Sequence, residues 1–260
     1  SALKLFERAL GQSPDPREVA SIYVHIGSCH KDREDYPRAL EALAEAEKRN
    51  RELKEIYNLR GFCHFKLKQH HEAIAAFERT IISRDAPLDR YLSGDKDALS
   101  ESAAKGYELF MGKGKCAECH FGVNLDDDRF HALQVPENPE HLSDPRIAAT
   151  RRFVAKVYHF EEYRTLAEDP GRYLITKEQK DWKAFRTPTL REIARTGPYM
   201  HNGIFATLDE VIEFFNKGGG QGNTALKSLQ LTPEEKTQLK VFLEEALTGA
   251  PLAMTYPKVP

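Results

Sequence analysis

The stretch KGKCAECHFG, residues 113–122, brings two of the four cysteines of the chain within three positions and adds a histidine directly after them. Cys-x-x-Cys-His is the attachment signature of a c-type haem, in which each thiol adds to a haem vinyl group and the histidine binds the iron. Cys116 and Cys119 are therefore the predicted thioether positions, and His120 is the predicted iron ligand. A zinc site would need a second ligand pair at matched spacing, and no further Cys-x-x-Cys occurs in the sequence. One covalently attached haem c per chain is the prediction.

The elements around this motif follow a consistent order. A short amphipathic helix (Ala103, Tyr107, Phe110) precedes it. About fifty residues with many prolines and charges follow it, with only a brief helical pattern around residues 146–166. Two helices close the region, the first from the capping box Thr207-x-x-Glu210 and the second from Thr232-Pro233-x-Glu235. This order is typical of a cytochrome c-like domain, predicted over residues 93–260 with no substantial sheet. Gly106 would let its first helix approach the last one closely.

Residues 1–92 show a period of 34, the length of a tetratricopeptide repeat. They resemble the end of one repeat (Ala2, Phe6, Ala9, Pro14) followed by two whole repeats, so we expect the natural chain to continue upstream. The predicted fold is all-α, with helical repeats before the haem domain and a linker near residues 83–100. Cys29 and Cys63 are predicted to pack as small residues, because equivalent positions in successive repeats lie too far apart for a disulfide. The shift superimposes these pairs: Tyr23 and Tyr57, Gly27 and Gly61, Cys29 and Cys63, Ala39 and Ala73, Leu43 and Phe77.

Composition narrows the class of partner. The formal net charge of −2 gives no reason to expect nucleic acid as a partner. No apolar run approaches the roughly 18 residues that a membrane span needs. The first ten residues, SALKLFERAL, have an amphipathic helical pattern and lack the features of a signal peptide. We therefore expect no membrane span and no targeting signal in this chain.

Longer stretches carry a family resemblance. GYELFMGKGKCAECHFG, FRTPTLR, GPYMHNG and TLDEVIEFFNKGGG occur in this order, and residues 100–250 resemble the C-terminal haem domain of the bacterial di-haem cytochrome c peroxidases and MauG enzymes. The resemblance implies haem-iron redox chemistry and a periplasmic or otherwise extracytoplasmic location. It also implies that Arg186 and Arg191 lie near the haem, where propionate pairing and ordinary surface ion pairs are both open readings. Thr196 and Pro198 fall where the family supplies carbonyls to a calcium ion.

The sixth iron ligand is where the chain departs from the family. The family takes this ligand from a methionine or tyrosine fourteen positions beyond the histidine of Tyr-x-His, and here that position is Phe215. Phenylalanine has no lone pair, so the resemblance implies an open iron position unless Met200 or a histidine replaces the lost ligand. His201 and His131 are the candidate acid–base residues, and bracing of propionates or loops is the alternative for both. The acidic run 126–128 is read as a solvated loop, with calcium binding as its alternative.

The family enzymes carry two haems, but this chain has one motif and places repeats where the other haem domain would be. Two functions therefore stay open: a peroxidase-type haem enzyme with an open iron position, or an electron-transfer cytochrome with a six-coordinate haem. The repeats favour docking of a redox partner protein, since stacked helix pairs form a binding surface. A homodimer formed through the repeats is the alternative.

Overall fold

The computed structural model describes residues 2–11, 15–51, 53–81, 83 and 85–250. The chain divides into two compact units, Ser1–Ile82 and Ser83–Pro260. Pro14, the side chain of Ala2 and residues 251–260, which end the predicted haem domain, lie outside the description.

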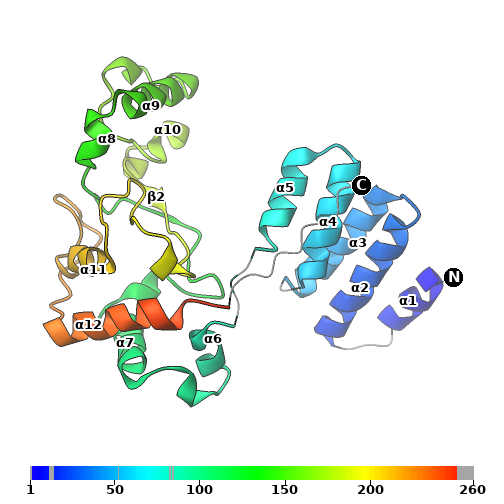
Figure 1. The fold of residues 1–260 in the computed structure, drawn as a ribbon. Helices are drawn as coiled ribbons and strands as arrows, with labels where there is room; N and C mark the ends of the chain where they lie inside the picture. The colour runs from blue at the N-terminus through cyan, green and yellow to red at the C-terminus, as the bar shows by residue number, and fades with distance from the viewer. Residues whose placement is uncertain (1, 12–14, 52, 82, 84, 251–260) are drawn as a thin grey trace. The chain divides into compact units, whose positions relative to one another are not determined.

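The first unit consists of helices that pack in sequence order (Figure 1). Helix α1 packs on α2, α2 pairs with α3, and α4 pairs with α5. Helices α3 and α5 begin at Tyr36 and His70, which is the 34-residue period (70 − 36). The end of one repeat and two helix pairs are thus present, as the sequence predicts. The bounds are α1 Ala2–Leu10, α2 Pro16–Lys31, α3 Tyr36–Arg49, α4 Lys54–Lys66 and α5 His70–Glu78.

Equivalent contacts recur in the two helix pairs. An added Cβ on Gly27 would lie 3.3 Å from the carbonyl oxygen of Ala39, and one on Gly61 would lie 3.5 Å from that of Ala73. Both glycines therefore mark the same close approach of the two helices in a pair. Cys63 is buried and both repeat cysteines are free thiols, which agrees with the predicted packing role.

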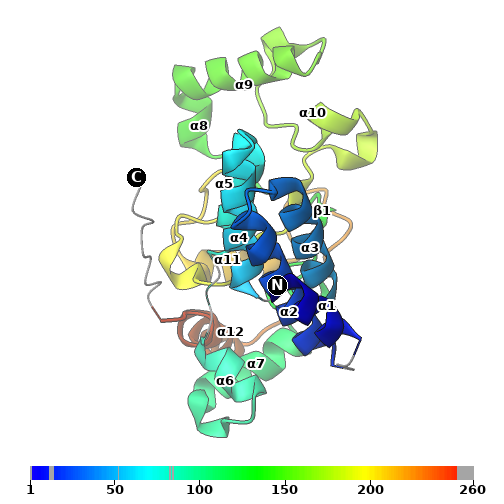
Figure 2. The same cartoon turned by 90° about the vertical axis from the view of Figure 1, so that its right-hand side faces the viewer.

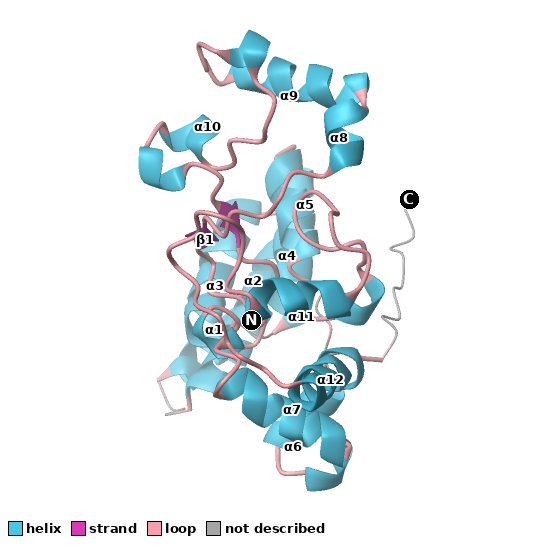
Figure 3. Cartoon of the chain, turned by 90° about the vertical axis from the view of Figure 1, so that its left-hand side faces the viewer, coloured by secondary structure: helices cyan, strands magenta, loops and turns pink. Residues whose placement is uncertain are grey.

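The second unit is mostly helix and loop (Figure 3). Its only strands among the described residues are β1 (Phe130–His131) and β2 (Phe185–Arg186), an antiparallel pair that aligns Phe130 with Arg186. The all-α prediction is confirmed. The α-helices are α6 Pro87–Leu92, α7 Glu101–Met111, α8 Pro139–Ser143, α9 Pro145–Val157, α10 Tyr173–Thr176, α11 Leu208–Asn216 and α12 Pro233–Val241. The short 3₁₀ turns are η1 Lys96–Ala98, η2 Cys116–Glu118, η3 Tyr163–Thr165, η4 Gln179–Asp181 and η5 Ile193–Arg195, and the π-helix η6 Phe242–Ala246 extends α12.

Helix α7 crosses α12 and η6 at the core of the second unit (Figure 1). An added Cβ on Gly106 would lie 2.7 Å from Cβ of Phe242 and closer still to the carbonyl oxygen of Gln238, so only glycine fits this crossing. The ring of Phe110 packs against that of Phe242, with centroids 5.2 Å apart. Both predicted capping boxes are present, at Thr207 and at Thr232. The close approach predicted for Gly106 is confirmed.

Residues 83–92 belong to the second unit. Leu88 of α6 is buried in the same core as Phe110 and Phe242. The structural division between residues 82 and 83 thus lies ten positions before the predicted boundary between residues 92 and 93. Residues 83–92 have the polar composition of a linker, and the sequence does not show that Leu88 among them is buried. At the other end of this unit, α8, α9 and α10 lie apart from α7 and α12 (Figure 2). Among the described residues, no helix has the length and apolarity to cross a membrane.

Candidate haem site

The haem motif follows a tight turn at the end of α7. The amide of Gly114 donates to the carbonyl of Leu109 at 2.7 Å, and an added Cβ on Gly114 would lie 2.8 Å from that oxygen. Lys115 then adopts a left-handed conformation, with φ of 53°, before η2 begins at Cys116. The backbone amide of His120 donates to the carbonyl of Cys116 at 2.9 Å. The turn thereby places both cysteines and the histidine on one compact loop.

The imidazole of His120 is held in the form that binds iron. Its Nδ1–H donates to the carbonyl oxygen of Leu125 at 2.9 Å, which leaves the lone pair of Nε2 free. Burial lowers the pKa of His120, against opposing effects of this hydrogen bond and of the charges of Asp127 and Asp126. A neutral, oriented imidazole beside two free thiols is the donor set that a c-type haem requires. The residues fit the group.

The two thiols are both partly buried, but Cys116 lies against the apolar core and Cys119 lies near Asp127 and His131. Burial raises the pKa of Cys116 to about 12, and its Sγ donates to the carbonyl of Gly114 at 3.3 Å. Burial also raises the pKa of Cys119, with further contributions from the charges of Asp127 and Glu118. Both groups are therefore uncharged thiols at neutral pH in the unmodified chain. Cys116 packs against the core formed by α7 and α12.

His131 lies next to the motif. Its Nε2–H donates to Oδ2 of Asp127 at 2.7 Å. One donor atom from each of Cys119, Asp127 and His131 lies within 4.8 Å of the others, and this is the only such cluster among the described residues. The side chain of Asp127 is 3% exposed, whereas that of Asp128 is 81% exposed. The prediction of a solvated acidic loop is thus wrong for Asp127.

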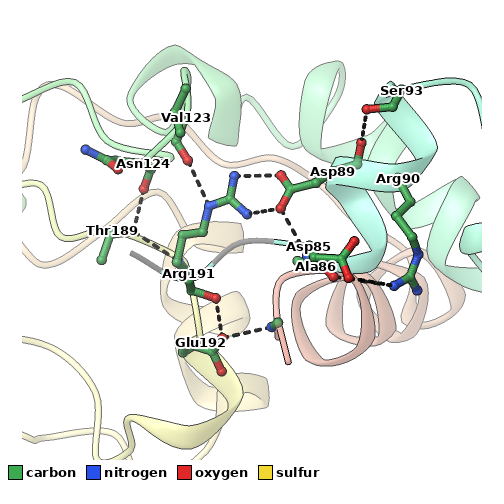
Figure 4. A network of polar contacts seen from close by, with 12 residues as sticks. Asp85, Ala86, Asp89, Arg90, Ser93, Val123, Asn124, Thr189, Arg191 and Glu192 are labelled. Atoms are coloured by element: carbon green, nitrogen blue, oxygen red, sulfur yellow. Dashed lines mark hydrogen bonds and ion pairs between the residues drawn. The ribbon is translucent and has the colours of Figure 1, made fainter. Parts of the chain in front are cut away.

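The two predicted arginines make different contacts. Arg186 bonds Asp128 at 2.8 Å and Asp126 at 3.5 Å, and about half of its side chain is exposed. Arg191 is largely buried, and its two Nη groups donate to the two oxygens of Asp89 at 2.7 and 2.8 Å. Its Nε donates to the carbonyl of Val123 (Figure 4). Arg191 therefore ties α6 to the loop that follows the haem motif, and propionate pairing stays a prediction for both arginines.

A second loop, residues 196–203, carries most of the remaining candidates. Its Gly197–Pro198 peptide bond is cis, and Met200 has a φ of 68°. The ring of His201 stacks on Phe185 with centroids 3.5 Å apart. Burial lowers the pKa of His201, although the residue as a whole is exposed. The ring of Phe185 in β2 thus positions His201. Strand β2 pairs with β1, which contains His131.

The remaining candidates lie on this loop and on the helix after it. The hydroxyl of Thr196 donates to the carbonyl of Ile193 at 3.2 Å. Phe215 lies in the last turn of α11 and is half-buried, and its ring meets that of Phe214 edge-on at 5.3 Å. Phe214 itself is buried against Phe205. These positions do not test a role as ligand or carbonyl donor, which stays a prediction.

Two residues of the site were not identified from the sequence. Asp127 is one: the sequence shows it as part of the acidic run 126–128, and only its four-residue spacing to His131 indicates a place in the haem site. Asn202 is the other: it is 4% exposed, and its Nδ2 donates to the carbonyl of Pro136 at 2.7 Å. In return, Nδ2 of Asn138 donates to the carbonyl of Asn202 at 3.0 Å. This pair fixes the 196–203 loop to the segment after β1.

Comparison with known proteins gives a match over the N-terminal helices and separate matches over about three quarters of the chain. A family model described as anaphase-promoting complex, cyclosome, subunit 3 matches residues 1–80. The cytochrome-c peroxidase IdrP1 of Denitromonas iodatirespirans is 45% identical over 203 residues, covering 75% of this chain and 54% of that protein. The methylamine utilization protein MauG of Methylorubrum extorquens is 30% identical, covering 72% of this chain and 46% of that protein. The chain thus spans about half the length of the curated relatives it matches.

A solved structure gives the same result. The crystal structure of a MauG-like protein associated with microbial copper homeostasis matches with a TM-score of 0.53 and 30% identity. The match covers 70% of this chain and 57% of that one. The geometry around His120 and these relatives agree on haem as the cofactor. The chain belongs to the family of the bacterial di-haem cytochrome c peroxidases and MauG proteins.

Proposed function

We propose that the second unit carries one covalently attached haem c and performs haem-iron redox chemistry of the peroxidase or MauG type at an open sixth position. The observation that carries this proposal is the hydrogen bond from His120 to Leu125, which orients a neutral imidazole beside Cys116 and Cys119. When bound, the haem would supply one-electron redox chemistry and a site for peroxide or a small gas. The chain's own residues hold it and shape its surroundings.

The open position follows from Phe215. This residue occupies the place from which the family takes its sixth ligand, and its ring offers no lone pair. The neighbouring phenylalanines 205 and 214 form an apolar cluster with it, which would disfavour water near that face of the site. His131 lies in β1, and the ring of His201 stacks on Phe185 in the paired strand β2. These two histidines are the candidates to accept and return a proton.

The spectrum of the oxidised, haem-loaded protein tests the open position. High-spin iron that binds azide or cyanide quickly is the expected result. A low-spin spectrum with a sulfur-to-iron band, unchanged by azide, would instead support a six-coordinate electron-transfer cytochrome in which Met200 provides the ligand.

Replacing Phe215 sharpens this test. Phe215→Met should create the sulfur-to-iron band and abolish azide binding, because it restores a ligand at the family position. Phe214→Met is the matched control: its side chain is buried against Phe205, so the spectrum should keep its high-spin form. If both substitutions leave the spectrum unchanged, Phe215 does not face the iron and the open-position proposal fails.

The repeats are proposed to dock a redox partner protein. A surface hollow between α2 and α4 is lined by apolar and polar side chains, which is a composition suited to a peptide segment. Pairing of two copies through the repeats is the alternative, and sedimentation of the purified chain distinguishes it. The lining residues are Val24, His25, Ser28, Glu55, Asn58 and Leu59.

Calcium and location complete the proposal. The carbonyls of Thr196 and Pro198 are the candidate calcium ligands, and a change of the haem spectrum on adding a chelator is the expected sign of such an ion. Family membership supports a periplasmic or otherwise extracytoplasmic location. Fractionation of cells that produce the natural protein tests the location.

A further inference from the structure

A buried carboxylate lies at the edge of the haem site. Asp127 comes from the loop after the haem motif, and the residues around it come from three other segments: Cys119 from the motif, His131 from β1, and Thr187 directly after β2. One donor atom each of Cys119, Asp127 and His131 lies within 4.8 Å of the others. If Cys119 is bonded to the haem, this carboxylate lies close to a sulfur atom that is part of the haem's own covalent framework.

The carboxylate is charged and shielded from water. Its side chain is 3% exposed, and it accepts hydrogen bonds from His131 at 2.7 Å and from the backbone amide of Arg129 at 3.0 Å. Burial alone would raise the pKa of Asp127, but the hydrogen bonds from Thr187, His131 and Arg129 outweigh it and lower the pKa to about 2. Asp127 thus carries a negative charge at neutral pH in a region that solvent screens poorly.

The neighbouring acids are in a different state. Asp126 and Asp128 both pair with Arg186, so their charges are largely compensated. Asp128 is also 81% exposed, where water and salt screen a charge efficiently. Asp127 has no contact with Arg186 among the described ion pairs, and its main side-chain partners are a hydroxyl and an imidazole. The charge of Asp127 therefore acts on the haem site without the arginine that compensates Asp126 and Asp128.

The sulfur, carboxylate and imidazole set resembles a small metal site, but the thiol of Cys119 is the predicted point of haem attachment. A thioether sulfur is a poorer ligand than a thiolate. The cluster is therefore better explained through its effect on the haem than as a separate metal centre.

We propose that Asp127 is a tuning residue that lowers the reduction potential of the haem attached at Cys119, with His131 and Thr187 holding its carboxylate in place. The physical reason is that the oxidised haem carries one more positive charge than the reduced haem, and a nearby buried anion stabilises the oxidised form. The charge of Asp127 already acts on the imidazole of His120, the predicted iron ligand. This inference rests on the proposed function, because it requires the covalent haem.

The test is a spectroelectrochemical titration of the haem-loaded full chain. Asp127→Asn keeps the shape of the side chain and removes its charge, so the midpoint potential should rise. Asp128→Asn, one position away and exposed, is the matched control and should shift the potential much less. The absorbance spectrum of the oxidised protein should be unchanged in both variants, which shows that the iron keeps the same ligands. A shift of the midpoint potential then reports the lost charge and not a structural change at the iron.

A second variant covers the case in which Asp127→Asn fails to attach haem. Thr187→Val removes one hydrogen-bond donor to Asp127 and leaves the carboxylate charged. Because one hydrogen bond fewer then offsets the negative charge of Asp127, the midpoint potential should fall below that of the unaltered chain. The inference is overturned if the Asp127 and Asp128 variants shift the midpoint potential equally. It is also overturned if either Asp127→Asn or Thr187→Val leaves the midpoint potential unchanged. An unaltered chain that is purified without haem would instead refute the proposed function itself.

Discussion

Gly61 lies in the first unit, the repeat unit, and Gly106 lies in the second unit, the haem unit. Each glycine lies inside a helix that packs on a neighbouring helix, but the space for an added Cβ differs greatly between them. An added Cβ on Gly61 meets its first neighbour at 3.5 Å, an ordinary contact, with the carbonyl of a residue twelve positions along the chain. An added Cβ on Gly106 would overlap the backbone of Gln238, more than a hundred positions away. The contact at Gly61 is thus local and leaves room for a methyl group, whereas the contact at Gly106 is long-range and leaves none.

Alanine at each glycine gives the largest contrast between the units. Gly106→Ala should destabilise the haem unit by about 3 kcal/mol or more, because the two helices must separate to admit the methyl group. Gly61→Ala should change stability by no more than about 1 kcal/mol, in the stabilising direction, since alanine favours a helix. Denaturant unfolding checks both, with the single tryptophan, Trp182, reporting on the haem unit and circular dichroism on the whole chain. Equal effects of the two substitutions would contradict the comparison.

The same difference explains what could be predicted from the sequence. The 34-residue period and the capping boxes at Thr207 and Thr232 follow from residue types at fixed spacing, and all are present. The haem motif is likewise local. The close approach at Gly106 joins distant segments, and the order of the elements around the haem motif predicts it. The contact of Asp89 with Arg191 joins segments 102 positions apart, and that of Thr187 with Asp127 joins segments 60 positions apart. No local sequence pattern predicts either contact. The predicted boundary at residues 92 and 93 differs from the structural division between residues 82 and 83 for the same reason.

Fragments that begin at Ser83 and at Ser93 test the role of α6. The longer fragment retains Leu88 in the core and the two bonds from Arg191 to Asp89, so it should fold and attach haem. The shorter one should be less stable by about 2–3 kcal/mol, mainly through lost burial of Leu88. Denaturant midpoints of the two haem-loaded fragments give the measurement. Equal midpoints would show that residues 83–92 are a linker, as their composition indicates.

Acid should remove from the haem unit the specific contribution that Asp127 makes to its stability. Because the pKa of Asp127 is lowered to about 2 in the folded chain, its stabilising contribution is complete above the unfolded value of about 4 and disappears as the pH falls toward 2. The unaltered chain should exceed Asp127→Asn by roughly 2 kcal/mol near pH 6, and this difference should shrink to near zero at pH 2. Stability curves of both proteins across this range check the prediction. A difference that stays constant with pH would show that the carboxylate is not the group responsible.

The most direct measurement of the central claim is the mass of the denatured, purified protein, compared with its haem absorbance. One covalent haem at Cys116 and Cys119 predicts the mass of the chain plus a single haem that survives denaturation. The doubly substituted chain, Cys116→Ala with Cys119→Ala, should show the mass of the polypeptide alone, whereas substituting the repeat cysteines, Cys29→Ala with Cys63→Ala, should leave the single haem in place. No added haem, two haems, or a haem lost on substituting the repeat cysteines would contradict the account.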